Sequence, residues 1–147
     1  MHPKSIEQLL SAREHSFAGT QSLDAIKLAE ELKAEFIPDD YLDFLMEFGC
    51  GFYLSEEFIG LGGQEHLDFR KVRHRLLSRN VGARFPPQFI PVYGDGMGNF
   101  DVIDLGRSAR DCSYIAFWCH DGPVQDIGPV GYWSWFEQML KDVLEDG

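Results

Sequence analysis

The sequence has 147 residues, of which 44% are hydrophobic and 25% charged, a balance typical of one soluble globular domain and not of a disordered or fibrous chain. Asp and Glu outnumber Lys and Arg by 24 to 13, giving a formal charge of -11 that disfavours direct binding of nucleic acid. The longest apolar run, residues 114–119, is far shorter than the ~20 residues that cross a bilayer, so we expect no contact with a membrane.

Two predicted helices open the chain. Ser5 begins a capping box before apolar residues at helical spacing, which predicts a short helix. This helix lies within residues 1–21, which we interpret as an N-terminal helical extension of the domain. A second helix is predicted to begin near Ser22, with apolar side chains on one face and charged side chains on the other.

A third helix is predicted over residues 41–48. Pro38 suits the first turn of this helix, and the carboxylates of Asp39 and Asp40 complement the positive end of its dipole. Gly49 follows the last apolar residue and is expected to end the helix in a left-handed conformation.

Short apolar runs separated by turn residues replace the helical spacing in the rest of the chain. They predict strands over residues 58–61, 89–93, 100–105 and 114–119. Helical spacing returns over residues 66–79 and 134–145. We therefore expect a single α+β domain over residues 1–147. Its antiparallel or mixed sheet would have about four to six strands, flanked by N-terminal helices, a middle helix and a C-terminal helix.

The segment between the second and third predicted strands is rich in residues that tolerate positive φ, which predicts a tight hairpin. We assign a structural role there to Gly94, Asp95, Gly98, Asn99 and Asp104. The oxygen-bearing side chains of Asp95, Asn99 and Asp101 also resemble calcium ligands. The segment lacks the distal Glu of an EF-hand, so the turn interpretation is preferred.

The three cysteines, Cys50, Cys112 and Cys119, are an odd number without Cys-x-x-Cys spacing, which predicts reduced, mostly packed thiols with neither a disulfide framework nor a zinc site. The first residues contain no apolar stretch of the kind a secretory signal requires, so we expect a cytoplasmic protein. The five histidines show no metal-binding spacing, and residues 60–63 lack the lysine of a P-loop. We interpret residues 60–63 as a flexible strand exit.

Cys119, His120 and Asp121 place a thiol, an imidazole and a carboxylate side by side in the sequence. Adjacent residues on a strand point to opposite faces, so we expect a buried Cys119 beside a surface turn and no catalytic triad. We assign no catalytic, cofactor-binding or metal-binding residue and expect no cofactor. A hydrolase that uses Cys119 and His120 remains open as a separate hypothesis.

The acidic excess is concentrated in two thirds of the chain. Residues 1–50 carry 4 basic and 10 acidic side chains, residues 51–100 carry 6 and 5, and residues 101–147 carry 3 and 9. The cations of the middle third are expected to balance neighbouring carboxylates. The acidic thirds would suit a basic partner, because complementary charge accelerates association.

Two segments resemble the SMI1/KNR4 family, within the SUKH superfamily. Residues 37–45, read as Ile-Pro-Asp-Asp-Tyr-Leu-Asp-Phe-Leu, are similar to the family's segment of proline, acid and tyrosine before a helix. Residues 89–105 are similar to its strand, Gly-Asp-x-x-Gly-Asn turn and returning strand. The resemblance covers roughly residues 22–145 and implies an α+β fold with a mixed or antiparallel sheet.

For bacterial members, the resemblance implies immunity proteins that bind and neutralise a cognate toxin, often a nuclease or deaminase; fungal relatives are implied to act as scaffolds. We therefore expect a non-enzymatic immunity protein with a basic protein toxin as its partner, and a monomer or weak homodimer. The alternative is an intracellular scaffold or regulatory module of the same fold. The acidic residues expected to lie in loops and bind the partner are Glu56, Glu57, Asp101, Asp121 and Asp126.

Overall fold

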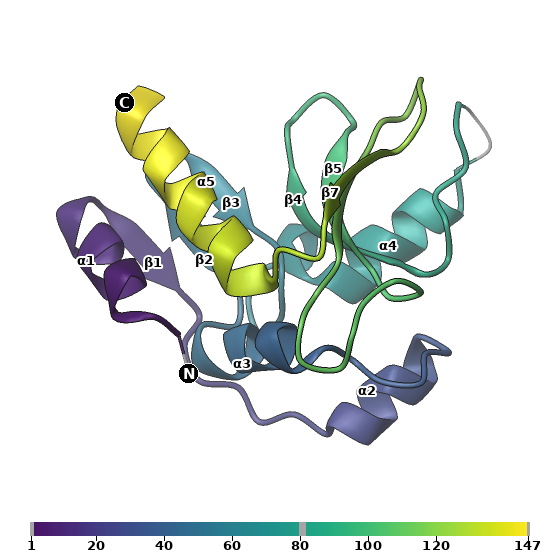
Figure 1. Ribbon diagram of the computed structural model, residues 1–147, viewed down its shortest axis with the longest axis horizontal. Coiled ribbons are helices and arrows are strands. Elements are labelled where there is room, and N and C mark those ends of the chain that lie inside the picture. Colours follow the sequence, from purple (N-terminus) through teal and green to yellow (C-terminus); the bar gives the residue numbers. More distant parts are fainter. Residues whose placement is uncertain (1, 80–81, 147) are drawn as a thin grey trace.

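The computed structural model describes residues 2–79 and 82–146, in which the chain forms five α-helices, one 3-10 helix and seven strands (Figure 1). The helices are α1 (Lys4–Ala12), α2 (Ala25–Glu31), α3 (Asp39–Glu47), η1 (Glu65–Leu67), α4 (Phe69–Leu77) and α5 (Tyr132–Asp146). The strands are β1 (His15–Phe17), β2 (Gly51–Tyr53), β3 (Glu56–Phe58), β4 (Phe89–Gly94), β5 (Phe100–Asp104), β6 (Ile115–Trp118) and β7 (Gln125–Gly128). This succession confirms the predicted N-terminal, middle and C-terminal helices.

The described strands form two antiparallel sheets. One has the order β1-β2-β3, and the other is a meander with the order β4-β5-β6-β7. A hydrogen bond of 3.0 Å from the Ile59 N–H to the Val92 carbonyl connects the two sheets. The predicted α+β class is confirmed, and the strands divide between two sheets.

Three of the strands carry almost none of the alternation on which strand prediction depends. β1 and β2 have three residues each, and three of the four residues of β7 are exposed. Pairing with neighbouring strands holds such segments in place, so their own sequence carries little signal.

Gly60 lies at a close crossing of two backbone segments, which corrects the expected flexible strand exit. Its N–H donates to the Leu67 carbonyl at 2.8 Å, and the Leu61 N–H donates to the Gly49 carbonyl at 2.9 Å. A Cβ at Gly60 would lie 1.7 Å from the Gly49 carbonyl oxygen. Gly49 follows α3 with φ +73°, the predicted left-handed stop. Glycine is therefore required on both sides of this crossing.

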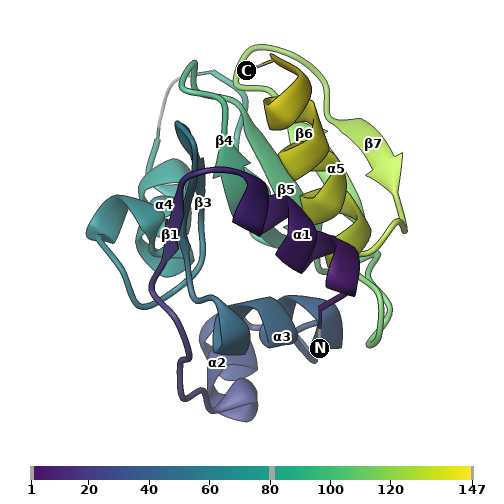
Figure 2. The ribbon, with the colours of Figure 1, turned by 90° about the vertical axis from the view of Figure 1, so that its left-hand side faces the viewer.

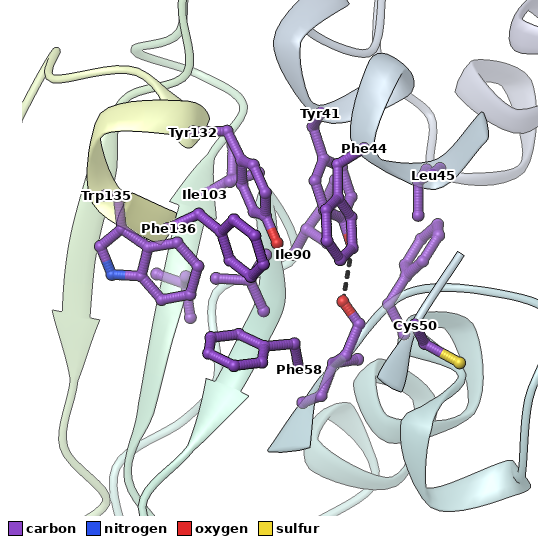
Figure 3. Close-up of a cluster of buried hydrophobic side chains, with 14 of the residues drawn as sticks. Tyr41, Phe44, Leu45, Cys50, Phe58, Ile90, Ile103, Tyr132, Trp135 and Phe136 are labelled. Atoms are coloured by element: carbon purple, nitrogen blue, oxygen red, sulfur yellow. Dashed lines mark hydrogen bonds between the residues drawn. The ribbon is translucent and has the colours of Figure 1, made fainter. Parts of the chain in front are cut away.

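Aromatic side chains from three elements meet at the centre of the molecule (Figure 3). Phe44 on α3, Tyr132 and Phe136 on α5, and Phe58 on β3 are fully buried. The ring centroids of Phe44 and Tyr132 are 4.7 Å apart, and those of Phe58 and Phe136 are 4.9 Å apart. Large buried rings contribute much of the stabilisation of a core, and α5 supplies two of these four. α5 therefore closes the core shared by both sheets.

The N-terminal helix belongs to the same packed body. α1 lies alongside α5 (Figure 2), and its Ile6 and Leu10 side chains are buried. The Tyr53 hydroxyl of β2 donates to the Leu9 carbonyl of α1 at 2.6 Å. These contacts tie the first helix to the helix that closes the core and to the three-stranded sheet.

The Asp40 carboxylate joins three parts of the fold that are distant in sequence. Its Oδ1 accepts the Tyr41 N–H at 2.8 Å and the Ser113 hydroxyl at 2.5 Å. Its Oδ2 accepts the N–H groups of Ser113 at 2.9 Å and Tyr132 at 2.8 Å. The Tyr132 N–H belongs to the first turn of α5 and has no partner within its own helix. Asp40 on α3 therefore caps α5.

Candidate interaction site

The turn between β4 and β5 is closed by the Asp95 side chain. Its Oδ1 accepts the N–H groups of Met97 at 2.8 Å and Asn99 at 3.2 Å. Its Oδ2 accepts the Asn99 side-chain amide at 3.0 Å. Burial alone would raise the pKa of Asp95, but these hydrogen bonds outweigh it and lower the pKa.

The other residues expected to shape this hairpin border the same two strands. Gly94 ends β4, and Gly98 has φ +91° in the turn. A Cβ at Gly98 would lie 3.2 Å from Nδ1 of His120. Asp104 ends β5, is only 7% exposed, and accepts the Gly106 N–H at 3.0 Å. Carboxylates that accept backbone N–H groups therefore lie at both ends of β5.

The five acidic residues expected to bind a partner do not share one surface. Glu56 and Glu57 lie on β3, Asp101 on β5 and Asp126 on β7, while Asp121 lies in the turn after β6. The expectation that all five lie in loops is therefore wrong for four of them. Short strands of an antiparallel sheet accept acidic residues wherever one face is open to water.

Glu57 and Asp126 are half exposed, and each carboxylate pairs with a basic side chain on a different element. Glu57 lies 2.5 Å from Nε2 of His66, and Asp126 lies 2.8 Å from the Arg107 guanidinium. Exposed pairs of this kind contribute only about 0–1 kcal/mol. Each of these two surface pairs can therefore break, and its carboxylate can bind another group, without loss of the fold.

Glu56 and Asp101 come together around the Tyr93 hydroxyl. Tyr93 donates a hydrogen bond to Glu56, and it is the register partner of Asp101 across β4 and β5. Burial raises the pKa of Tyr93 most, and the hydrogen bond and charge of Glu56 raise it further. The charges of Asp101 and Asp95 act in the same direction. Three carboxylates therefore concentrate negative potential at this point of the structure.

A groove of about 400 Å³ lies between α5 and β7, and Asp101 forms part of its wall. Ile127 and Val130 remain 47% and 43% exposed there, which gives the groove an apolar surface open to solvent. We name it the α5–β7 groove; its lining residues are Asp101, Ile127, Val130, Ser134, Trp135, Gln138, Met139 and Asp142. A cavity of about 420 Å³ beyond α2 is lined by charged side chains of both signs, Lys33 and Glu35.

Asp101 is partly buried beside Trp135. The Trp135 indole N–H, which points away from the aromatic cluster in Figure 3, donates to Asp101 Oδ2 at 2.7 Å. Burial raises the pKa of Asp101 from its ordinary value, and the nearby charge of Asp95 adds to this effect, although the hydrogen bond from Trp135 opposes it. The environment of Asp101 therefore disfavours the negative charge of its ionised form.

Cys119, His120 and Asp121 lie in the turn after β6 and not on the strand. β6 ends at Trp118, so strand alternation does not separate the three side chains, and Cys119 is partly exposed where a buried thiol was expected. The thiol donates to Asp121 at 2.8 Å, and this hydrogen bond raises the pKa of Cys119. A catalytic thiolate requires a lowered pKa, so the arrangement disfavours the hydrolase hypothesis.

Comparison with protein-family models provides the deciding observation. The model described as SMI1 / KNR4 family (SUKH-1) matches residues 21–142, most of the chain. The chain belongs to the SMI1/KNR4 family. This family is associated with immunity proteins. No curated protein sequence matches the chain. Within the described residues, no helix has both the length and the apolar character needed to span a bilayer.

Most of the groove in this SMI1/KNR4 chain was not found from the sequence. Ile127 lies in β7, a segment without strand alternation, and Val130 follows it, so β7 and its groove wall were missed. A signal does exist on α5. Trp135, Met139 and Asp142 recur at helical spacing, which places an aromatic, an apolar and an acidic side chain on one face.

Replacing Asp101 with Asn is expected to raise the free energy of unfolding at pH 7. The raised pKa means that the folded state binds the proton more tightly than the unfolded chain does. Stability therefore falls as the pH rises from about 4 through the folded pKa, then stays constant. Asn retains an oxygen for the Trp135 indole and carries no charge. Urea unfolding between pH 4 and 7 should show a flatter pH dependence for D101N.

Asp142 supplies the matched control for this experiment, because its carboxylate lines the same groove but is exposed. D142N should change stability by less than about 0.5 kcal/mol. A D101N variant that is less stable than the wild type across the whole pH range would contradict the assigned environment.

Proposed function

We propose that this chain is a non-enzymatic immunity protein that neutralises a basic protein toxin, of the nuclease or deaminase type, by contact through the α5–β7 groove. The observation that carries the proposal is the partly buried carboxylate of Asp101 in a largely apolar groove. The negative charge of Asp101 destabilises the folded, unbound protein. A residue that destabilises the fold is characteristic of a site retained for binding.

The groove combines the two properties that a tight, selective interface needs. Ile127, Val130 and Met139 offer apolar area that a partner side chain can cover. Asp101 and Asp142 line the same space and can accept hydrogen bonds from Lys or Arg. A basic side chain that enters the groove would relieve the unfavourable charge of Asp101 at the moment of binding.

The charge of the whole chain favours the same class of partner. A formal charge of -11 steers a cationic protein toward the surface and raises its association rate. Toxins that cleave or modify nucleic acid carry basic active sites, because they must hold phosphates. Membership of a family associated with immunity proteins supports this interpretation.

Two triple variants with equal loss of charge test the proposal. The groove variant E56Q/D101N/D142N removes the two carboxylates that line the groove and Glu56, the hydrogen-bond partner of Tyr93. The control E57Q/D121N/D126N removes three carboxylates that do not line the groove. Long-range steering falls equally in both, so any difference between them reports the contact itself. We expect the groove variant to bind the toxin at least tenfold more weakly, about 1.4 kcal/mol, and the control to bind like the wild type apart from slower association.

The measurement is growth of bacteria that co-express each variant with a toxin encoded beside its gene, together with surface plasmon resonance on the purified pair. Thermal unfolding of both variants establishes that they are folded. Equal binding by the two variants would overturn the assignment of the groove. Failure of the wild-type chain to rescue growth would overturn the immunity function and favour the scaffold alternative.

A further inference from the structure

The turn after β6 brings three metal-binding groups together. Cys119 Sγ, a ring nitrogen of His120 and a carboxylate oxygen of Asp121 all lie within 4.8 Å of one another. The side chains of His120 and Asp121 are 34% and 73% exposed, so an ion can reach them from solvent. The cluster lies outside the α5–β7 groove, whose lining contains none of the three residues.

A separate set of hydrogen bonds orients the His120 ring. Asn99 Oδ1 accepts the His120 backbone N–H at 3.1 Å and lies 2.9 Å from His120 Nδ1. The Asn99 amide nitrogen donates to Asp95 at 3.0 Å, so the oxygen of this amide is the atom that faces His120. This contact selects the tautomer of the neutral ring in which Nδ1 carries the hydrogen and Nε2 carries the lone pair.

Nε2 of His120 lies 3.9 Å from Asp121 Oδ2, and the Cys119 thiol donates to the other oxygen of the same carboxylate, Oδ1, at 2.8 Å. An imidazole with one nitrogen donating to a fixed carbonyl and the other free is the arrangement found in metal-binding histidines. Asp95, which holds Asn99 in place, thus acts as an outer support for the same ring.

We propose that Cys119, His120 and Asp121 bind a zinc ion. Zinc bonds of about 2.0–2.3 Å in a tetrahedral site separate neighbouring ligand atoms by about 3.3–3.8 Å, which small side-chain rotations reach from the observed spacing. Thiolate with imidazole selects zinc over magnesium or calcium, which prefer oxygen alone. On binding, the thiol proton passes to solvent, the ion replaces it between sulfur and carboxylate, and water occupies the fourth position.

Cobalt(II) titration of the untagged protein tests the site, since cobalt occupies zinc sites and reports a bound thiolate by a charge-transfer absorption. We expect one equivalent of cobalt to produce this band and one equivalent of zinc to abolish it. Cys119→Ser should eliminate the band. Cys112→Ser is the matched control, because Cys112 is also partly exposed, and it should retain the band.

The orienting role of Asn99 gives a second readout. N99A leaves all three ligands in place and is expected to weaken zinc binding about 10- to 100-fold, as loss of an outer-shell partner does in other sites. Zinc should also slow alkylation of Cys119 by iodoacetamide without protecting Cys112. A missing thiolate band in the wild type, or a band unchanged in C119S, would overturn the proposal. Because the probes are metal ions alone, either result is independent of toxin binding.

Discussion

Replacing Asp40 with Ala is expected to lower the free energy of unfolding by about 3 kcal/mol or more. The substitution removes the acceptor for the N–H groups of Ser113 and Tyr132, and both residues are fully buried. A buried donor left without a partner costs about 1–3 kcal/mol, so two such donors account for the estimate. D40N should fall between the wild type and D40A, because the amide oxygen accepts on one side only. Urea denaturation measures the three proteins.

Asp39 provides the control for this experiment. It also lies in the first turn of α3, but it is exposed, and its side chain forms no hydrogen bond or ion pair with another element within the described residues. D39N should therefore cost less than about 1 kcal/mol, the range of a charge near a helix terminus. If D40A and D39N have the same stability, the carboxylate of Asp40 does not hold α3 and α5 together.

Replacing Gly60 with Ala should be comparably damaging, with an expected loss of about 3 kcal/mol or more or failure to fold. A Cβ at this position would overlap the Gly49 carbonyl oxygen, 1.7 Å away, and also approach the Leu45 side chain at 3.3 Å. The backbones that cross here are joined by the hydrogen bond from Leu61 to Gly49, so neither segment can move away without losing it. Overpacking against backbone is more costly than overpacking against a flexible side chain.

Gly122→Ala is the matched substitution for this second prediction, since the nearest atoms to its Cβ would be 3.7 and 4.0 Å away, at ordinary contact distance. Its effect should be within about 0.5 kcal/mol. Thermal unfolding of both variants provides the measurement. Wild-type stability in G60A would show that the crossing is looser than the structure indicates.

The sequence predicted the elements whose signal is local. Apolar spacing over residues 41–48, followed by Gly49, was sufficient to place α3 and its end, because a helix and its left-handed stop depend on neighbouring residues. The hairpin around Asp95 was predicted for the same reason, since the aspartate bonds to groups two and four residues away.

The sequence pattern did not predict the contacts between segments that are distant in the sequence. Asp40 was interpreted as a charge near the start of its own helix, whereas its carboxylate binds Ser113 and Tyr132, more than 70 residues away. Asp101 was grouped with loop acids because its neighbours in the sequence gave no sign that Trp135 packs on it. Periodicity records which face is buried, and only the tertiary structure shows what it is buried against.

The aromatic core has a consequence for how the chain folds during synthesis. Tyr132 and Phe136 on α5 complete the packing around Phe44 and Phe58, but α5 follows every described strand in the chain. Both sheets therefore leave the ribosome before the helix that closes their common core is available. In that interval the inner rings of α3 and β3 face water, and the nascent chain presents a surface that chaperones bind and that aggregates. These rings can be covered only after α5 has emerged.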